Sequence, residues 1–191
     1  MSWKPGLLLR PSGRLAKRKE IETPSLASKV IVRHAREEDL NAMEWEGEFT
    51  YFRRVYADAF QRMERGYSAL WVAEMADIGL IGQVFIQMTC DRPELADGID
   101  RAYLYSFRVR DAYRSQGVGS KMMEVVEEDL RQRGFAFVTL NVARDNPRAQ
   151  QLYIKRGYHV VATEPGVWSY PDDKGVWHNV EEPAWRMEKL L

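Results

Sequence analysis

The spacing of hydrophobic residues between positions 102 and 142 predicts a strand, a helix and a second strand. Residues 102–109 (AYLYSFRV) are rich in aromatic and β-branched side chains, which is typical of a strand. Apolar side chains then recur every fourth position from Val118 to Leu130, with charged residues on the opposite face, as in an amphipathic helix. Gly134 is suited to end this helix, and the mostly apolar residues 135–142 indicate the second strand.

The rest of the chain continues this mixture of strands and helices. Further strands are predicted at residues 30–33, 69–74, 81–88, 158–163 and 184–190. Helices are expected to begin at residues 36–39, to cover 52–63 and to begin again at 146. The strands at 69–74 and 81–88 look like a hairpin, and in the second of them Val84, Ile86 and Met88 alternate with Gln83, Phe85 and Gln87. Residues 90–101 and 164–183 are rich in turn formers and are expected to be loops.

The connection before the amphipathic helix is a candidate phosphate-binding turn, Arg114-Ser115-Gln116-Gly117-Val118-Gly119. Its two glycines have no Cβ atoms, so the main chain can turn tightly and a ligand can approach it closely. The helix that follows presents unpaired N–H groups and the positive end of its dipole at the same place. Together these features favour the binding of an anion such as a phosphate.

This turn and a second motif, Asn146-Pro147, Ala149, Leu152-Tyr153, Lys155 and Gly157-Tyr158, resemble the GNAT superfamily of N-acetyltransferases. The resemblance covers roughly residues 103–161. It implies an α+β fold, a splayed mixed sheet of about seven strands flanked by about four helices. It also implies acetyl-coenzyme A as co-substrate. A dinucleotide is disfavoured because Met122 occupies the third glycine position of the Rossmann fingerprint.

The resemblance places coenzyme A against the end of strand 102–109, the turn and the helix that begins at 146. The residues concerned are Phe107, Arg108, Val109, Arg114, Ser115, Gln116, Gly117, Val118, Gly119, Ser120, Asn146 and Tyr153. Main-chain groups of a strand edge can pair with the amides of the pantetheine arm as an added strand would. Asn146 is also a favoured helix N-cap, a role that competes with ligand binding. The resemblance assigns Tyr153 to protonate, or hydrogen-bond, the departing sulfur.

The general base is left unassigned. Many relatives carry a glutamate on the cofactor strand, where this chain has Tyr105 and Ser106. Acids elsewhere could serve, and so could water relayed through these two residues. The candidate acids are Glu46, Glu48, Asp91, Glu94, Asp97 and Asp100.

The amino-acid composition limits the possible partners and the cellular location of the protein. Lys and Arg total 28 and Asp and Glu total 28, so the balanced charge disfavours a nucleic-acid partner. No apolar run approaches the roughly 20 residues that span a bilayer. A single cysteine, Cys90, excludes an intrachain disulfide, and no metal site is expected. We therefore expect a cytoplasmic protein without a membrane partner; a homodimer is left open.

Two segments are predicted. Residues 1–29 are basic and interrupted by Pro and Gly, which indicates an extension that is partly disordered or packed on the domain. Residues 30–191 form the expected catalytic domain. The leading hypothesis is acetyl transfer to a primary amine, of a small molecule or of an exposed protein amine, by direct attack in a ternary complex. The alternative is a non-catalytic module that binds coenzyme A for regulation or partner binding.

Overall fold

The computed structural model describes residues 25–191, so most of the predicted basic extension, residues 1–24, lies outside the described residues. Seven strands form one mixed sheet in the order β1-β2-β3-β4-β5-β9-β6, and β7 and β8 form a separate hairpin. The strand bounds are β1 Ile31–His34, β2 Ser68–Met75, β3 Gly79–Gln87, β4 Arg101–Val109, β5 Phe137–Ala143, β6 His159–Glu164, β7 Val167–Pro171, β8 Trp177–Glu181 and β9 Ala184–Leu190.

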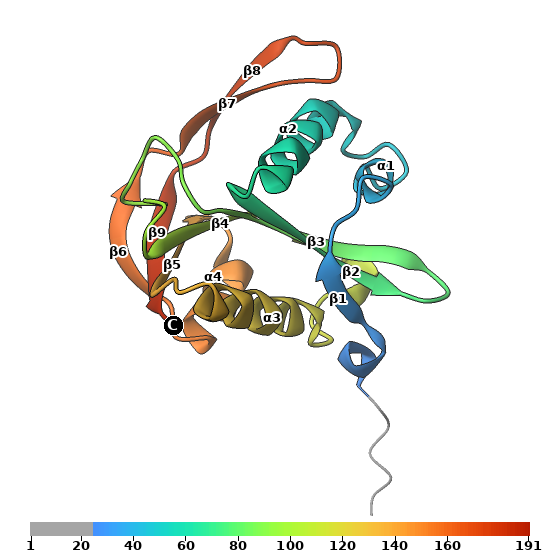
Figure 1. The fold of residues 1–191 in the computed structure, drawn as a ribbon, viewed down its shortest axis with the longest axis horizontal. Helices are drawn as coiled ribbons and strands as arrows, with labels where there is room; N and C mark the ends of the chain where they lie inside the picture. The colour runs from blue at the N-terminus through green and yellow to red at the C-terminus, as the bar shows by residue number, and fades with distance from the viewer. Residues whose placement is uncertain (1–24) are drawn as a thin grey trace, which may run out of the picture.

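Helices cover both faces of the sheet (Figure 1). α1 and α2 lie on one face, and α3 and α4 lie on the other. The bounds are α1 Asp39–Ala42, α2 Arg53–Glu64, α3 Val118–Gln132 and α4 Pro147–Lys155, with short 3-10 turns η1 Leu26–Lys29, η2 Thr50–Phe52 and η3 Asp111–Tyr113. Each face buries its own apolar cluster, one including Met122 of α3 and the other Tyr56 of α2. The mixed α+β class and the splayed sheet expected from the sequence are confirmed.

The hairpin expected from residues 69–74 and 81–88 is confirmed, because β2 and β3 pair in antiparallel. Both faces of the sheet are covered, so β3 is buried from Leu80 to Ile86, and Gln83 is only 1% exposed. Gln83 Nε2 donates to Ser106 Oγ at 3.2 Å, while its Oε1 has no hydrogen-bond partner among residues 25–191.

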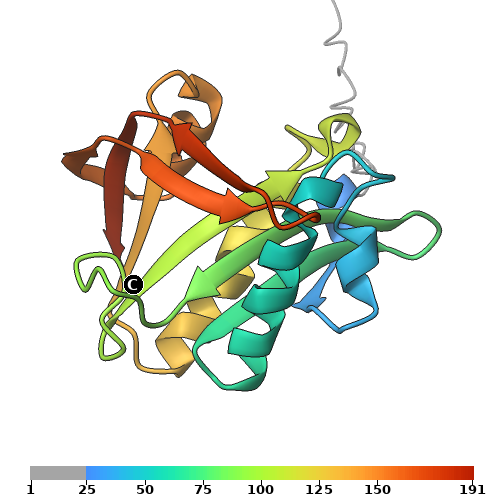
Figure 2. The ribbon, with the colours of Figure 1, turned by 90° about the horizontal axis from the view of Figure 1, so that it is seen from above.

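One prediction was wrong, because residues 164–183 are more than a loop. β7 and β8 form an antiparallel hairpin there, joined by a turn at Asp172 to Val176. The turn is held by Asp172 Oδ1, which accepts main-chain N–H groups of Lys174 and Val176 at 2.9 Å each. Figure 2 shows the hairpin extending from the strands of the C-terminal half toward α2. No helix in the described part of the chain is long and apolar enough to cross a membrane.

The feature that positions the site is the parting of β4 and β5. They pair in parallel only from Arg101 to Leu104 on β4, opposite Phe137 to Leu140 on β5. Beyond these residues β4 continues beside β3, while β5 continues beside β9, so the sheet opens between its two halves (Figure 2). The turn and α3 follow the open end of β4.

Candidate active site

A cleft of about 190 Å³ lies where β4 and β5 part. Its walls come from β4, β5 and α4, with one residue before β9. They are lined by Leu104, Tyr105, Ser106, Phe107, Asn141, Val142, Ala143, Asn146, Ala149, Tyr153 and Glu182. Three residues expected from the sequence, Phe107, Asn146 and Tyr153, are therefore brought together in one cavity.

Ser106 bends β4 at this cleft. Its φ is +49°, a left-handed conformation that is uncommon for residues other than glycine. The pairing of β3 with β4 shifts register at the same place, as at a β-bulge. The bulge moves the side-chain alternation by one position, so Tyr105 packs with the α2 cluster, Phe107 packs with the α3 cluster, and Arg108 returns to the α2 side.

Tyr153 reaches the cleft from α4. Pro147 occupies the first turn of this helix, and Asn146 caps it by accepting the Ala149 N–H at 3.1 Å. The Tyr153 ring is 6% exposed and packs edge to face on Tyr158, with centroids 5.7 Å apart. Burial, with a smaller contribution from Tyr103, raises the pKa of the Tyr153 hydroxyl, which therefore stays protonated at neutral pH. A protonated hydroxyl facing the cleft is a proton donor.

The glycine turn presents bare main chain at the start of α3. Gly117 is the N-cap residue with φ +85°, and a Cβ there would lie 3.2 Å from the Ala27 Cβ. Glycine is thus required both by the conformation and by the contact with η1. No side chain among residues 25–191 caps α3, so the first N–H groups of the helix are left for a ligand.

Polar side chains of the turn brace it from within. Arg114 donates from Nε to the Val109 carbonyl at 2.8 Å, and Gln116 donates from Nε2 to the Ala112 carbonyl at 2.8 Å. Ser115 has φ +60°, and its Oγ accepts Nη2 of Arg148 at 2.9 Å. These contacts fix the loop geometry.

The remaining residues of the predicted set contribute in different ways. Val118 is 1% exposed, so only its main chain can face a ligand. A Cβ on Gly119 would lie 3.4 Å from Phe107 Cζ, which brings the start of α3 close to the cleft wall. The Ser120 carbonyl accepts Nη1 of Arg156 at 3.1 Å. Arg108 directs its guanidinium to the α2 side, away from α3, so any contact of Arg108 with coenzyme A would be through its main chain.

Asn141 is a cleft residue that the sequence reasoning missed. It lies on β5, lines the cleft, and its Oδ1 is buried without a hydrogen-bond partner among residues 25–191. A buried carbonyl oxygen without a donor is costly, and it is a place where a ligand N–H can bind. A signal was available, because Asn141 and Thr139 are the two polar residues inside the mostly apolar segment 137–143.

The acids considered as a base are mostly committed to other contacts. Arg110 forms a two-point ion pair with Glu46, with N–O distances of 2.6 and 2.9 Å, and its hydrogen bond lowers the pKa of Glu46. Burial would raise the pKa of Asp97, but main-chain N–H groups of the 99–101 segment outweigh it and lower that pKa. Hydrogen bonds, including one from Arg92, lower the pKa of Glu94. Carboxylates held ionised in this way are weak bases.

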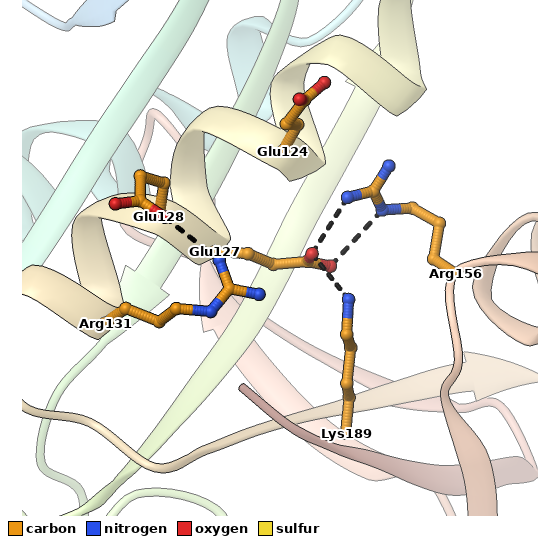
Figure 3. Close-up of a pocket in the computed structure, with 6 residues that line it drawn as sticks. All are labelled: Glu124, Glu127, Glu128, Arg131, Arg156 and Lys189. Carbon is orange, nitrogen blue, oxygen red and sulfur yellow. Dashed lines mark hydrogen bonds and ion pairs between the residues drawn. The ribbon is translucent and has the colours of Figure 1, made fainter.

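A second, larger cavity of about 500 Å³ lies on the outer side of α3 and is lined by charged residues (Figure 3). At its base Glu127 accepts Arg156 Nη2 at 2.8 Å, Lys189 Nζ at 2.6 Å and the Tyr158 hydroxyl at 3.2 Å. Burial alone would raise the pKa of Glu127, but these two cations outweigh it and lower the pKa. The network joins α3 to β9 and to the turn after α4. Because the negative charge of Glu127 is compensated by Arg156 and Lys189, we assign this cavity a structural role.

Comparison with known proteins agrees with this geometry. The model of a family described as the acetyltransferase (GNAT) family matches residues 35–158. The [ribosomal protein bS18]-alanine N-acetyltransferase of Haemophilus ducreyi is 28% identical over 74 residues, which are 39% of this chain and 51% of that protein. The chain thus spans about half the length of the curated relative it matches.

Solved structures share the fold. The ribosomal-protein-S18-alanine N-acetyltransferase of Escherichia coli superposes with a TM-score of 0.61 at 18% identity, covering 84% of this chain and 93% of that one. The spermidine N-acetyltransferase of Vibrio cholerae in complex with CoA and spermine gives a TM-score of 0.62 at 16% identity, covering 85% and 96%. At these identities the likeness shows the fold alone.

Proposed function

Because the chain belongs to the GNAT acetyltransferase family, an acyltransferase class, we propose that it transfers an acetyl group from acetyl-coenzyme A to a primary amine. The amine belongs to a small molecule or to an exposed protein group, and it attacks directly in a ternary complex. The parting of β4 and β5, with Tyr153 in the cleft between them, is the observation that carries this proposal.

The chain's own groups fit coenzyme A. Past Leu104, the side of β4 that faces β5 has no strand partner among the described residues, so its main-chain groups can pair with the pantetheine amides. The uncapped N-terminus of α3 suits the phosphates, and Asn141 Oδ1 provides an acceptor that is otherwise unsatisfied. Bound acetyl-coenzyme A would supply a thioester carbon for the amine to attack and a thiolate as leaving group.

Tyr153 is the proposed acid. Its hydroxyl is protonated at neutral pH even at the ordinary tyrosine pKa, and burial raises that pKa further, so it can donate a hydrogen bond or a proton to the departing sulfur. Asn146 contributes chiefly through the cap that orients α4, and with it the Tyr153 ring.

The acceptor must lose a proton, and no base is assigned among residues 25–191; Glu182 is the carboxylate that lines the cleft. An alkylamine with a pKa near 10 is only about one part in a thousand neutral at pH 7, a handicap of roughly 4 kcal/mol. The cofactor strand carries Tyr105 and Ser106 where a carboxylate would serve, and burial raises the pKa of the Tyr105 hydroxyl. Water relayed through Tyr105 and Ser106 would be one route for this proton, and a carboxylate such as Glu182 at the cleft would be another.

The test is thiol release from acetyl-coenzyme A in the presence of a panel of small amines and peptides, with the acetylated product identified by mass spectrometry. We expect thiol release that depends on the amine and forms one acetylated product per thiol. Binding of coenzyme A without transfer to any amine of the panel would instead favour the alternative, a non-catalytic coenzyme A module. That alternative is motivated by the missing carboxylate at Tyr105 and Ser106.

A further inference from the structure

Arg108 lies in an aromatic setting on the α2 side of β4. Its guanidinium carbon is 4.1 Å from the ring centre of Phe49 and 4.8 Å from that of Phe52. Nη1 donates to the Tyr56 hydroxyl at 2.8 Å. A guanidinium held between aromatic faces is fixed in orientation, since stacking and a hydrogen bond together restrict its rotation.

Arg108 forms no salt bridge within the described part of the chain, residues 25–191. Nearby acids are used elsewhere: Glu44 pairs with Arg53 at 2.6 Å, and Glu46 pairs with Arg110 at 2.6 Å.

Most donors of Arg108 are also unused. Arginine has five N–H donors, and of the hydrogen bonds between described side chains only the one to Tyr56 involves Arg108. Its other nitrogens are absent from the set of buried, unpartnered atoms, so they are open to a ligand or to solvent. A planar fork with free donors matches a carboxylate.

The position of Arg108 relates it to the reaction. Ser106, two residues earlier on β4, lines the cleft, and Gln83, which pairs with Arg108 across β3 and β4, donates to Ser106. Arg108 therefore lies beside the cleft on the sheet face opposite α3, whose N-terminus is the proposed phosphate site. An acceptor that approached the cleft from the α2 side would therefore pass Arg108, two residues along β4 from the cleft-lining Ser106.

The β7–β8 hairpin provides the other wall of this approach. Tyr170 lies 4.7 Å from Phe52, and Trp168 lies 6.3 Å from it in a stacked arrangement, measured between ring centres. The hairpin, missed from the sequence, thus brings aromatic side chains to the ring on which Arg108 stacks.

We propose that Arg108 binds a carboxylate of the acceptor, so that the acceptor is an amine bearing a free carboxylate close to its amino group. This inference rests on the proposed acetyl transfer and narrows its substrate class. The unpaired guanidinium of Arg108 would repel a polycationic amine. A carboxylate on the acceptor would instead neutralise its charge and accept its free N–H groups. The aromatic wall suits an apolar side chain on such an acceptor.

The experiment compares matched acceptors with and without the carboxylate: phenylalanine, phenylalaninamide and phenethylamine, together with lysine and cadaverine. We expect kcat/KM to be about tenfold to a hundredfold higher for the carboxylate members, the range of a charge-assisted hydrogen bond. Arg108→Gln should abolish the preference and Arg108→Lys should retain part of it. Arg110→Gln, which removes a guanidinium already paired with Glu46, is the matched control and should retain the preference.

A binding measurement separates this proposal from the proposed function. With coenzyme A present, N-acetylphenylalanine should raise the melting temperature of the wild type, N-acetylphenethylamine should raise it less, and Arg108→Gln should remove the difference. An active enzyme that treats both series alike would overturn the assignment of Arg108 but not acetyl transfer. Absence of turnover with every amine, alongside a carboxylate-dependent shift, would overturn acetyl transfer while leaving Arg108 as a carboxylate site. Absence of any carboxylate preference in both assays overturns the proposal.

Discussion

Replacing Tyr153 by phenylalanine removes one hydroxyl from the cleft and leaves the rest of the side chain in place. The ring keeps its edge-to-face contact with Tyr158, and no hydrogen bond of the Tyr153 hydroxyl to another described residue is lost. Tyr153→Phe should therefore change the free energy of unfolding by less than about 1 kcal/mol. Its affinity for coenzyme A should change equally little.

Turnover should respond far more strongly. General acid catalysis contributes about 10²–10⁴-fold, equivalent to about 3–5 kcal/mol of barrier. The thiolate is already a fair leaving group, so we expect the lower end, about a hundredfold loss in kcat.

The assay is thiol release under saturating acetyl-coenzyme A, with single-turnover mixing to ensure that chemistry limits the rate. Melting temperature and coenzyme A affinity are measured on the same preparations. Ile154→Val, an exposed change on the same helix outside the cleft lining, is the control for general disturbance of α4 and should retain most of the activity. A Tyr153→Phe enzyme within a few-fold of the parent rate would refute the role of the hydroxyl and leave Tyr153 as a packing residue.

Three further outcomes follow from the structure. In the absence of a strong base, kcat/KM should rise with pH until the acceptor amine is half deprotonated; a plateau below about pH 7 would reveal an efficient base. Glu127→Gln should cost about 3 kcal/mol in urea unfolding at neutral pH, because it leaves two cations unpaired. The folded-state pKa of Glu127 lies below 4.5, so the deficit should shrink as pH falls through that lowered pKa, and a deficit independent of pH would contradict the ion-pair account. Gly166→Ala should lower the melting temperature by several degrees, since its Cβ would lie 1.7 Å from the Glu182 carbonyl oxygen; Gly66→Ala, also at positive φ but with open space, should cost less.

The local sequence pattern was sufficient to predict most of the helices and strands. The aromatic and β-branched run became β4, the fourfold apolar repeat became α3, and Asn146 with Pro147 opened α4 as expected from capping chemistry. The family resemblance is confirmed by the family match, and the two motifs that carried it lie within the matched residues.

The features that were not predicted from the sequence depend on how distant segments of the chain pack together. The burial of both faces of β3 is not visible in its alternating sequence, because it depends on where α2 and α3 pack. The β7–β8 hairpin was hidden by turn formers such as Asp172 and Gly175, which proved to lie in its connecting turn. The direction of the Arg108 side chain was not predicted: the bulge at Ser106 turns it to the α2 side, while its main chain stays at the predicted coenzyme A strand. A one-residue change of register cannot be read from composition.

The central claim is that coenzyme A binds at the start of α3, beside the cleft between β4 and β5. Isothermal titration of coenzyme A into the wild type and Gly119→Glu tests it most directly. A Cβ at Gly119 meets Phe107 Cζ at 3.4 Å, an ordinary contact, so the variant should fold while its carboxylate repels the phosphates. Gln61→Glu, an exposed change on α2, adds the same charge on the other face of the sheet. We predict micromolar-range or tighter binding for the wild type and Gln61→Glu, and at least a hundredfold weaker binding for Gly119→Glu. Equal affinity of a folded Gly119→Glu protein would contradict the account.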